Sequence, residues 1–241
     1  MSTDPRYYDV VEATWPSASK FNVGPIVVRE GQGGGSRVSS ATANGPVSDV
    51  EISAAETAMR DLGQVPLFMM RVGDGDLDAQ LEERGYTVKD PVNMWACPAR
   101  LLTDVKIPRV TTFCIWEPLA IQREIWVSGG IGPERVAVMK RVTGAKTALL
   151  SRKDDKPAGA GFCAIHDGVA MVHALEILPH QRRKGMGVWM MRQAAYWALK
   201  NGADTLSVIC TKRNEGANGL YASLGMTLVG QYHYRILSNG D

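Results

Sequence analysis

Cysteine is scarce in this 241-residue chain, and its four cysteines are far apart. Cys97, Cys114, Cys163 and Cys210 form no CxxC pair, so the sequence predicts neither a metal site of the zinc type nor a disulfide framework. We interpret them as small core residues rather than nucleophiles. Long apolar runs and a secretory signal pattern are also missing, so we expect a cytoplasmic protein without a membrane partner.

A strong excess of one charge is absent as well. The formal net charge of +2 argues against a chain that binds nucleic acid as a whole. The charge is nevertheless uneven, because residues 1–100 carry a net −5 and residues 101–241 carry a net +7. An anionic ligand is therefore expected to bind the second half.

The second half alternates strand and helix patterns, which predicts a mixed α/β (α+β) fold. Apolar helical spacing with glycine stops predicts helices in residues 117–130, 132–144 and 217–225 and through Met190–Leu199. β-Branched and apolar runs predict strands in residues 109–116, 146–155, 157–168, 169–179, 205–211 and 231–237.

The first half partly repeats the end of the chain. "LDAQLEERGYTV" (Leu77–Val88) aligns with "ANGLYASLGMTL" (Ala217–Leu228) as helix, glycine and strand, and a helix and a strand precede both. An internal duplication predicts one domain in residues 1–100 and a second in residues 108–241, joined near "CPARLLTDVKIP". Chance similarity of two such units is the alternative.

Three cations precede a glycine pair in "HQRRKGMG", residues 180–187. A helix N-terminus disfavours Arg182, Arg183 and Lys184 unless an anion is bound there, and Gly185 and Gly187 allow a ligand close to the backbone. The alternative is a solvated basic loop. GxxxxGK[ST] and the third glycine of a dinucleotide fingerprint are missing. A second glycine-rich stretch, "REGQGGGSR" (residues 29–37), is interpreted as a flexible turn between two strands, "PIVV" and "RVSSAT".

Two motifs in this order carry a family resemblance. Arg182-x-x-Gly185-x-Gly187 resembles the Q/R-x-x-G-x-G/A signature of the GCN5-related N-acetyltransferase (GNAT) superfamily, and residues 214–226 resemble its N-x-x-A-x-x-LY-x-x-x-GF segment. The resemblance covers about the last 130 residues. It implies the GNAT fold, a central mixed and mostly antiparallel sheet flanked by helices, in two tandem copies. The first copy is degenerate, with Leu81 where the second has Tyr221.

The resemblance implies an N-acetyltransferase that moves the acetyl group of acetyl-CoA to an amine of a small molecule or peptide, without a metal. Backbone N–H groups of the loop are then expected to hold the pyrophosphate. The implied cofactor-binding residues are Ile177, Leu178, Arg182, Arg183, Lys184, Gly185, Met186, Gly187, Asn214 and Tyr221. Asn214 alone is equally consistent with a turn cap.

Three residues are candidates for catalysis. The resemblance places Tyr221 at the leaving thiolate, where we expect a hydrogen-bond donor first and an outright acid second, because phenol is a weaker acid than a thiol. His173 is the first candidate for the base, since it would titrate near neutrality. The period of two puts Met171, His173 and Leu175 on one face of its strand. Glu176 is the competitor, and Glu117 and His233 are outside candidates.

In relatives, the acceptor site lies between the first two helices and the terminal hairpin, here residues 119–143 and 226–236. Aromatic residues that could line it, or belong to the core, are Trp116, Trp126, Trp197, Tyr232 and Tyr234. The first half is either another wall of that pocket or a structural companion. A non-enzymatic acyl-CoA-binding or assembly module is the alternative function, and a homodimer stays open.

Overall fold

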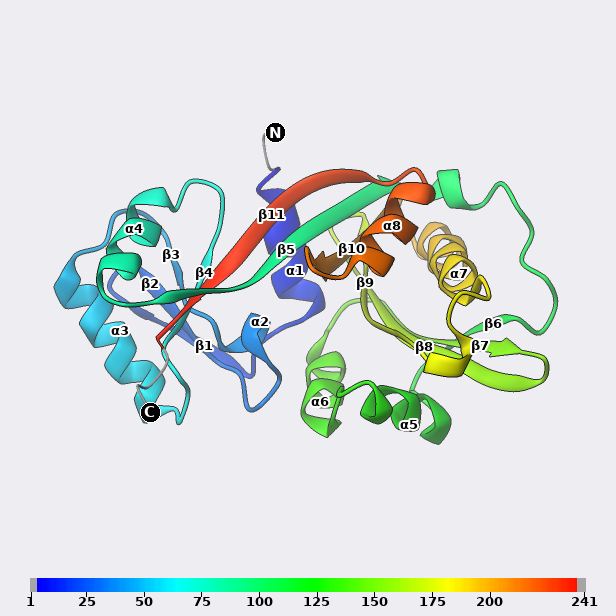
Figure 1. Ribbon diagram of the computed structural model, residues 1–241, viewed down its shortest axis with the longest axis horizontal. Coiled ribbons are helices and arrows are strands. Elements are labelled where there is room, and N and C mark those ends of the chain that lie inside the picture. Colours follow the sequence, from blue (N-terminus) through cyan, green and yellow to red (C-terminus); the bar gives the residue numbers. More distant parts are fainter. Residues whose placement is uncertain (1–3, 238–241) are drawn as a thin grey trace.

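The computed structural model describes residues 4–237. Its centre is an eight-stranded sheet in the order β4-β11-β5-β10-β9-β8-β7-β6 (Figure 1). Among these strands only β9 and β10 are parallel neighbours, so the predicted mixed, mostly antiparallel sheet is confirmed. The strands are β4 (Leu67–Met70), β5 (Thr87–Pro98), β6 (Thr112–Ile115), β7 (Lys146–Lys153), β8 (Lys156–His166), β9 (Val169–Ile177), β10 (Thr205–Thr211) and β11 (Thr227–Ile236).

Helices cover both faces of this sheet. On one face α7 (Met186–Lys200) and α8 (Glu215–Ser223) enclose a core that includes Met190, Val172 and Leu206. On the other face α1 (Arg6–Thr14), α5 (Ala120–Ser128) and α6 (Pro133–Arg141) pack against apolar side chains of the same strands. Alternation along β9 supplies both cores, since Val172 faces α7 and Met171 faces α1.

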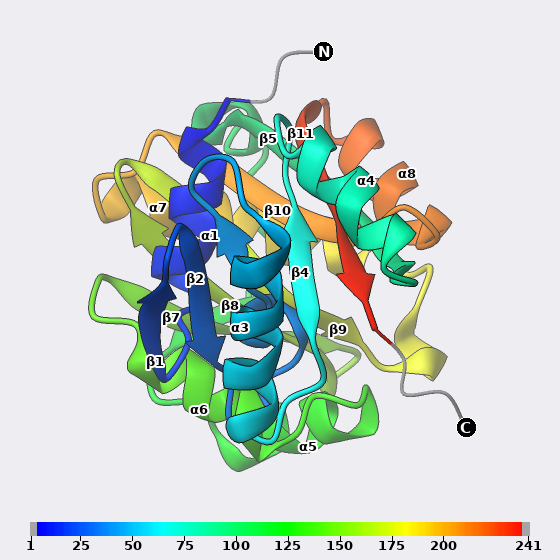
Figure 2. The ribbon, with the colours of Figure 1, turned by 90° about the vertical axis from the view of Figure 1, so that its left-hand side faces the viewer.

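The first half adds a small antiparallel sheet, β1 (Ser19–Val23), β2 (Ile26–Glu30) and β3 (Thr42–Ala43). The helix α3 (Asp49–Asp61) crosses this layer, as Figure 2 shows, and α4 (Gly75–Glu83) follows β4. The prediction of a strand from Arg37 was wrong over its first part, because residues 36–39 form the short helix α2 (Ser36–Ser39) and only β3 is extended.

The two halves exchange strands within the main sheet. Strand β5 comes from the first half but pairs with β10 on one side and β11 on the other, whereas β11 ends the chain and pairs with β4. Figure 1 shows these two long strands running side by side from one lobe to the other. A short 3-10 helix, η1 (Ala99–Leu102), follows β5 at the predicted linker. Residues 1–100 and residues 108–241, predicted as two domains, thus contribute strands to one sheet.

Candidate active site

A cleft opens where β9 and β10 separate. Their parallel pairing covers only Val169–Val172 and Thr205–Val208, and beyond it the two strands are no longer joined. A cavity of about 670 Å³ lies there, between the end of β9 and the starts of α7 and α8. Its walls are Leu175, Glu176, Ile177, Gln181, Arg182, Arg183, Gly185, Met186, Gly187, Val188, Asn214, Gly216, Ala217, Leu220 and Tyr221.

The loop before α7 leaves the N-terminus of that helix open to the cleft. Helix α7 has no side-chain cap and no acidic residue in its first turn, and its N-cap residue Gly185 has a φ of 78°. Arg183, two residues earlier, also has a positive φ, of 60°. Left-handed residues in such a turn direct successive backbone N–H groups inward, which together with the helix dipole forms an anion site.

The cations of the loop do not all face the cleft. Arg182 turns back onto β9, where its Nε donates to the Ile177 carbonyl at 3.0 Å and its Nη2 pairs with Glu176 at 3.0 Å. Lys184 bonds to Gln181 at 3.4 Å and lines no part of the cleft. Leu178, also predicted to contact the cofactor, packs against the core beneath α5 and α6. The anion site is therefore built mainly from backbone.

Gly187 has a second reason to lack a side chain. A Cβ at this position would lie 2.8 Å from Cδ2 of Leu220 on α8. The close approach of α7 to α8 is thus a packing reason for glycine at this position that does not depend on a ligand.

Tyr221 and Asn214 occupy the α8 side of the cleft. Tyr221 is buried, and within residues 4–237 its hydroxyl has no hydrogen-bond partner. Burial, with a smaller contribution from the neighbouring Cys210, raises the pKa of the tyrosine well above its usual value, so the hydroxyl keeps its proton and can donate a hydrogen bond. Asn214 caps α8, because its side-chain oxygen accepts from the Ala217 N–H at 3.0 Å.

His173 lines neither the cleft nor the second cavity described below. Its Nδ1 lies 2.9 Å from Nη1 of Arg37, and its Nε2 lies 2.8 Å from Oγ1 of Thr14. Thr14 donates its own hydroxyl proton to the Val10 carbonyl, so the histidine must donate from Nε2 and accept from Arg37 at Nδ1. Burial, and then the charge of Arg37, lowers the pKa of His173 well below 6.5. These contacts favour a neutral, positioning histidine over a base.

A β-bulge changes which side chains of β9 reach the cleft. His173 pairs with Phe162 and Glu176 with Ala160, so two residues of β9 oppose a single residue of β8. Ala174, within the bulge, has a φ of 49°. The expected placement of Leu175 on the face of His173 was wrong, because the bulge turns Leu175 toward the cleft and the α7 core.

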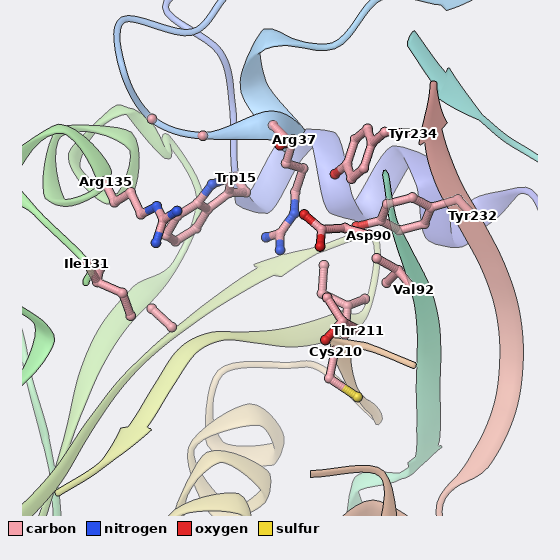
Figure 3. A pocket seen from close by; sticks show the side chains of 15 residues that line it. Trp15, Arg37, Asp90, Val92, Ile131, Arg135, Cys210, Thr211, Tyr232 and Tyr234 are labelled. Carbon is pink, nitrogen blue, oxygen red and sulfur yellow. The ribbon is translucent and has the colours of Figure 1, made fainter. Parts of the chain in front are cut away.

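A second cavity, of about 290 Å³, lies on the other side of the gap between β9 and β10. The cleft and this cavity are adjacent at β9, where Leu175 lines the first and Ala174 the second. Figure 3 shows side chains from both halves around it: Trp15, Arg37, Asp90 and Val92 from the first, and Ile131, Arg135, Cys210, Thr211, Tyr232 and Tyr234 from the second.

Known proteins give three comparisons. The model of the acetyltransferase (GNAT) family matches residues 124–226. An uncharacterized N-acetyltransferase of Bacillus subtilis (strain 168), YobR, is 25% identical over 93% of this chain and 94% of its own. A GCN5-related N-acetyltransferase from Kribbella flavida superposes with a TM-score of 0.72, at 20% identity, over 100% of this chain and 97% of that one.

The chain has the GNAT fold. A tandem GNAT protein from the clavulanic acid biosynthesis pathway also superposes, with a TM-score of 0.61 at 11% identity, over 84% of this chain and 76% of that one. The family model covers less than half of the chain, so these matches show similarity in sequence and in fold; members of the GNAT family use acetyl-CoA as co-substrate.

Most residues predicted from the GNAT signatures line the cleft, with Leu178 and Lys184 as the exceptions. Of the aromatic candidates for the acceptor site, Tyr232 and Tyr234 line the second cavity, whereas Trp126 is fully buried. The outside candidates are engaged elsewhere: His233 with Asp78 at 3.0 Å and Glu117 with Lys140 at 3.2 Å.

Sequence reasoning left open whether the first half forms a wall of the acceptor pocket, and it named none of the residues of that half that line the second cavity. Arg37 ends the glycine-rich stretch, and Asp90 lies within β5 at an irregularity in its pairing with β11. Nothing in their local sequence indicates that they line one cavity with Arg135. The stretch itself is closely packed, since a Cβ at Gly34 would lie 2.6 Å from Val138 of α6.

The remaining expectations concern metals, membranes and thiols. Across residues 4–237 no group of three or more His, Cys, Asp and Glu side chains is placed to hold a metal ion. In the same range no helix is long and apolar enough to cross a membrane. The four cysteines are free, and burial raises the pKa of Cys97 and of Cys210 to about 11, which leaves their thiols protonated.

Proposed function

We propose that this protein is an N-acetyltransferase that transfers the acetyl group of acetyl-CoA to the amine of a small molecule. The observation that carries the proposal is the cleft between β9 and β10, where an uncapped α7 N-terminus and Tyr221 line one cavity. The GNAT family match supports the choice of acetyl-CoA. Pyrophosphate is the anion that such a backbone site holds, and the apolar walls formed by Leu175 and Leu220 suit the pantetheine arm.

The second cavity is the proposed entry for the amine. The neutral amine attacks the thioester carbonyl carbon, a C–N bond forms, the C–S bond breaks, and CoA leaves as a thiolate. One proton leaves the amine nitrogen and one proton joins the sulfur, so the products are the amide and the CoA thiol. The bulge at Ala174 and Leu175, which removes backbone groups from the regular ladder, is the proposed source of an N–H for the oxyanion.

Tyr221 is the proposed donor to the leaving sulfur. Because its pKa is raised, a hydrogen bond to the thiolate rather than full proton transfer is the expected contribution. Glu176, the competing candidate, faces the cleft beside Arg182 and is the proposed base for the amine proton, reached through water, while His173 is proposed to be a positioning residue.

We also propose that the first half is a shortened tandem copy of the second. Apart from α2, which lies between β2 and β3, the order α1-β1-β2-β3-α3-β4-α4-β5 repeats the helix and strand order α6-β7-β8-β9-α7-β10-α8-β11. In this repeat β4 corresponds to β10, and β5 corresponds to β11. Exchanging the members of each pair turns the strand order β4-β11-β5-β10 into β10-β5-β11-β4, which is the same order read backwards. Parallel contacts between Ala41 and Phe68 take the place of the β9–β10 pairing.

Calorimetry with acetyl-CoA, with NADH as the control, tests the co-substrate. Micromolar binding of acetyl-CoA without binding of NADH is expected. Release of CoA thiol in the presence of an amine panel then tests transfer. Absence of acetyl-CoA binding overturns the assignment of the cleft, whereas binding without thiol release toward any amine favours the alternative, a non-enzymatic acyl-CoA-binding module.

A further inference from the structure

The second cavity has an unbalanced charge. Two arginines line it, Arg37 from α2 and Arg135 from α6, and neither forms an ion pair with any residue in the described range 4–237. The single carboxylate among the lining residues is Asp90, which pairs with Arg213 at 3.0 Å. Arg213 is 81% exposed at its side chain, so it stands at the rim.

Arg37 is held in place rather than free to seek solvent. Its guanidinium lies 5.4 Å from the ring centre of Trp15, and its Nη1 donates to the neutral His173. Its Nε is buried without a hydrogen-bond partner in the described chain. Figure 3 shows the side chain directed into the cavity from α2. An arginine that is fixed by a neutral partner retains donors and its full charge for a ligand.

Arg135 approaches the same space from the opposite wall. Its Nη1 donates to the Gly130 carbonyl at 3.1 Å, a neutral partner again. A Cβ on Gly35 would lie 3.3 Å from its Nη2, so the glycine-rich turn before α2 leaves room for this guanidinium. Placing two cations in a partly enclosed cavity, whose carboxylate Asp90 pairs with Arg213 instead, costs free energy that a bound anion would offset.

We infer that the acceptor is a small amine that also carries a carboxylate, with the carboxylate bound by Arg37 and Arg135 and the ammonium received beside Asp90. This inference rests on the proposed function. Guanidinium groups bind carboxylates through paired N–H donors. The remaining walls, Trp15, Ile131 and the edge-to-face pair Tyr232–Tyr234, suit an apolar side chain, and a volume of about 290 Å³ suits an amino acid rather than a long peptide.

The test uses matched ligands that differ only in the carboxylate. Apolar amino acids are compared with their amides, for example leucine with leucinamide, and with 3-methylbutylamine, which lacks the group altogether. CoA release with acetyl-CoA gives kcat/KM, and calorimetry with CoA already bound gives Kd. We expect the acids to be favoured over the amides by about 10- to 100-fold, the range for hydrogen bonds to a charged group.

Variants then assign the preference to the two arginines. Arg135→Gln is expected to bring the acid-to-amide ratio close to one while acetyl-CoA binding is unchanged. Arg37→Lys, which keeps the charge but loses the fork, is expected to reduce the ratio partly. Arg123→Gln is the matched control, since Arg123 is half exposed on α5 and does not line the cavity.

The outcomes separate this inference from the proposed function. If acetyl-CoA binds and the amides bind or react as well as the acids, or if neither class binds, the inference is wrong. Loss of acid preference in Arg123→Gln equal to that in Arg135→Gln would also overturn it. If acids bind in an Arg135-dependent way but no CoA is released, the inference stands and the transferase function fails.

Discussion

Under the proposed duplication the helices α3 and α7 are counterparts, but their N-termini are opposite in character. Helix α3 begins at Ser48 with a capping box, in which Ser48 and Glu51 satisfy each other's backbone N–H groups, and its first turn contains Asp49 and Glu51. Helix α7 begins at Gly185 without a cap or an acidic residue. The first helix closes its own anion site, and the second leaves it open.

The helices that follow differ in the same way. Leu81 of α4 and Tyr221 of α8 are both buried, but only Tyr221 carries a hydroxyl. Under the proposed duplication, the first half keeps a buried packing residue at this position and lacks the hydroxyl. Within one sheet, the half that contains the candidate site therefore differs from the other half in a few side chains near the starts of two helices.

The largest expected effect comes from making α7 resemble α3. Val188 is the third residue of α7, as Glu51 is of α3, and Val188→Glu places a carboxylate in the proposed anion site. Repulsion of about 2–3 kcal/mol at an effective dielectric near 20 predicts a loss of acetyl-CoA affinity of about 30- to 160-fold by calorimetry. Val188→Gln is the uncharged control and is expected to stay within about threefold. Equal losses in both variants would indicate a steric effect.

The second effect comes from making α8 resemble α4. Tyr221→Phe removes the hydroxyl and keeps the buried ring. Because the hydroxyl is proposed to stabilise the thiolate only as it forms, kcat should fall by about 10- to 100-fold while the Kd of acetyl-CoA stays within about twofold. Rapid-quench assays under single-turnover conditions measure the rate of acetyl transfer directly. An unchanged kcat would mean that Tyr221 is a packing residue like Leu81.

The cleft was largely predictable because its parts are local. The loop Arg182–Gly187 and the segment Asn214–Tyr221 each form one helix start, so short motifs contain the information needed. Within these segments, the sequence did not predict the directions in which side chains point. Arg182 folds back onto Glu176, and the spare space at Gly187 is taken by Leu220, neither of which spacing alone can reveal.

The second cavity and the strand exchange were not predictable in this way. Arg37, Asp90 and Arg135 come from segments that only the tertiary fold brings together, and the bulge at Ala174 changes the alternation on which the placement of Leu175 depended. The placement of β5 between β10 and β11 likewise follows from long-range pairing. Periodicity predicts the faces of an element but not its partners or its irregularities.

The third effect concerns the contact that joins the halves, His173 with Thr14 and Arg37. The lowered pKa means that the folded state binds fewer protons than the unfolded state below about pH 6.5, so stability is complete above that pH and decreases as the pH falls. Between pH 7.5 and 5.5 the native protein should lose about 1.4 kcal/mol more of its unfolding free energy than His173→Gln does. Urea titrations at both pH values measure this. Parallel pH profiles would show that His173 titrates normally.

The same substitution separates a positioning role from a merely structural one. If His173 orients Arg37, then His173→Gln should raise KM for leucine more than for leucinamide, with kcat little changed. An equal rise for both acceptors would limit His173 to packing.

The smallest expected effect tests why the second residue of α7 is a glycine, whereas the second residue of α3 is the exposed Val50. Gly187→Ala adds a methyl group that meets Leu220 at 2.8 Å, so its helix-propensity gain of about 1 kcal/mol should be offset. In a Leu220→Ala background the gain should appear, and a double-mutant cycle in urea measures this coupling. If helix packing is the whole reason for the glycine, acetyl-CoA affinity in the double variant stays within about threefold of Leu220→Ala. A tenfold loss would show that the ligand itself requires the space, and the anion site would then extend along the helix to Gly187.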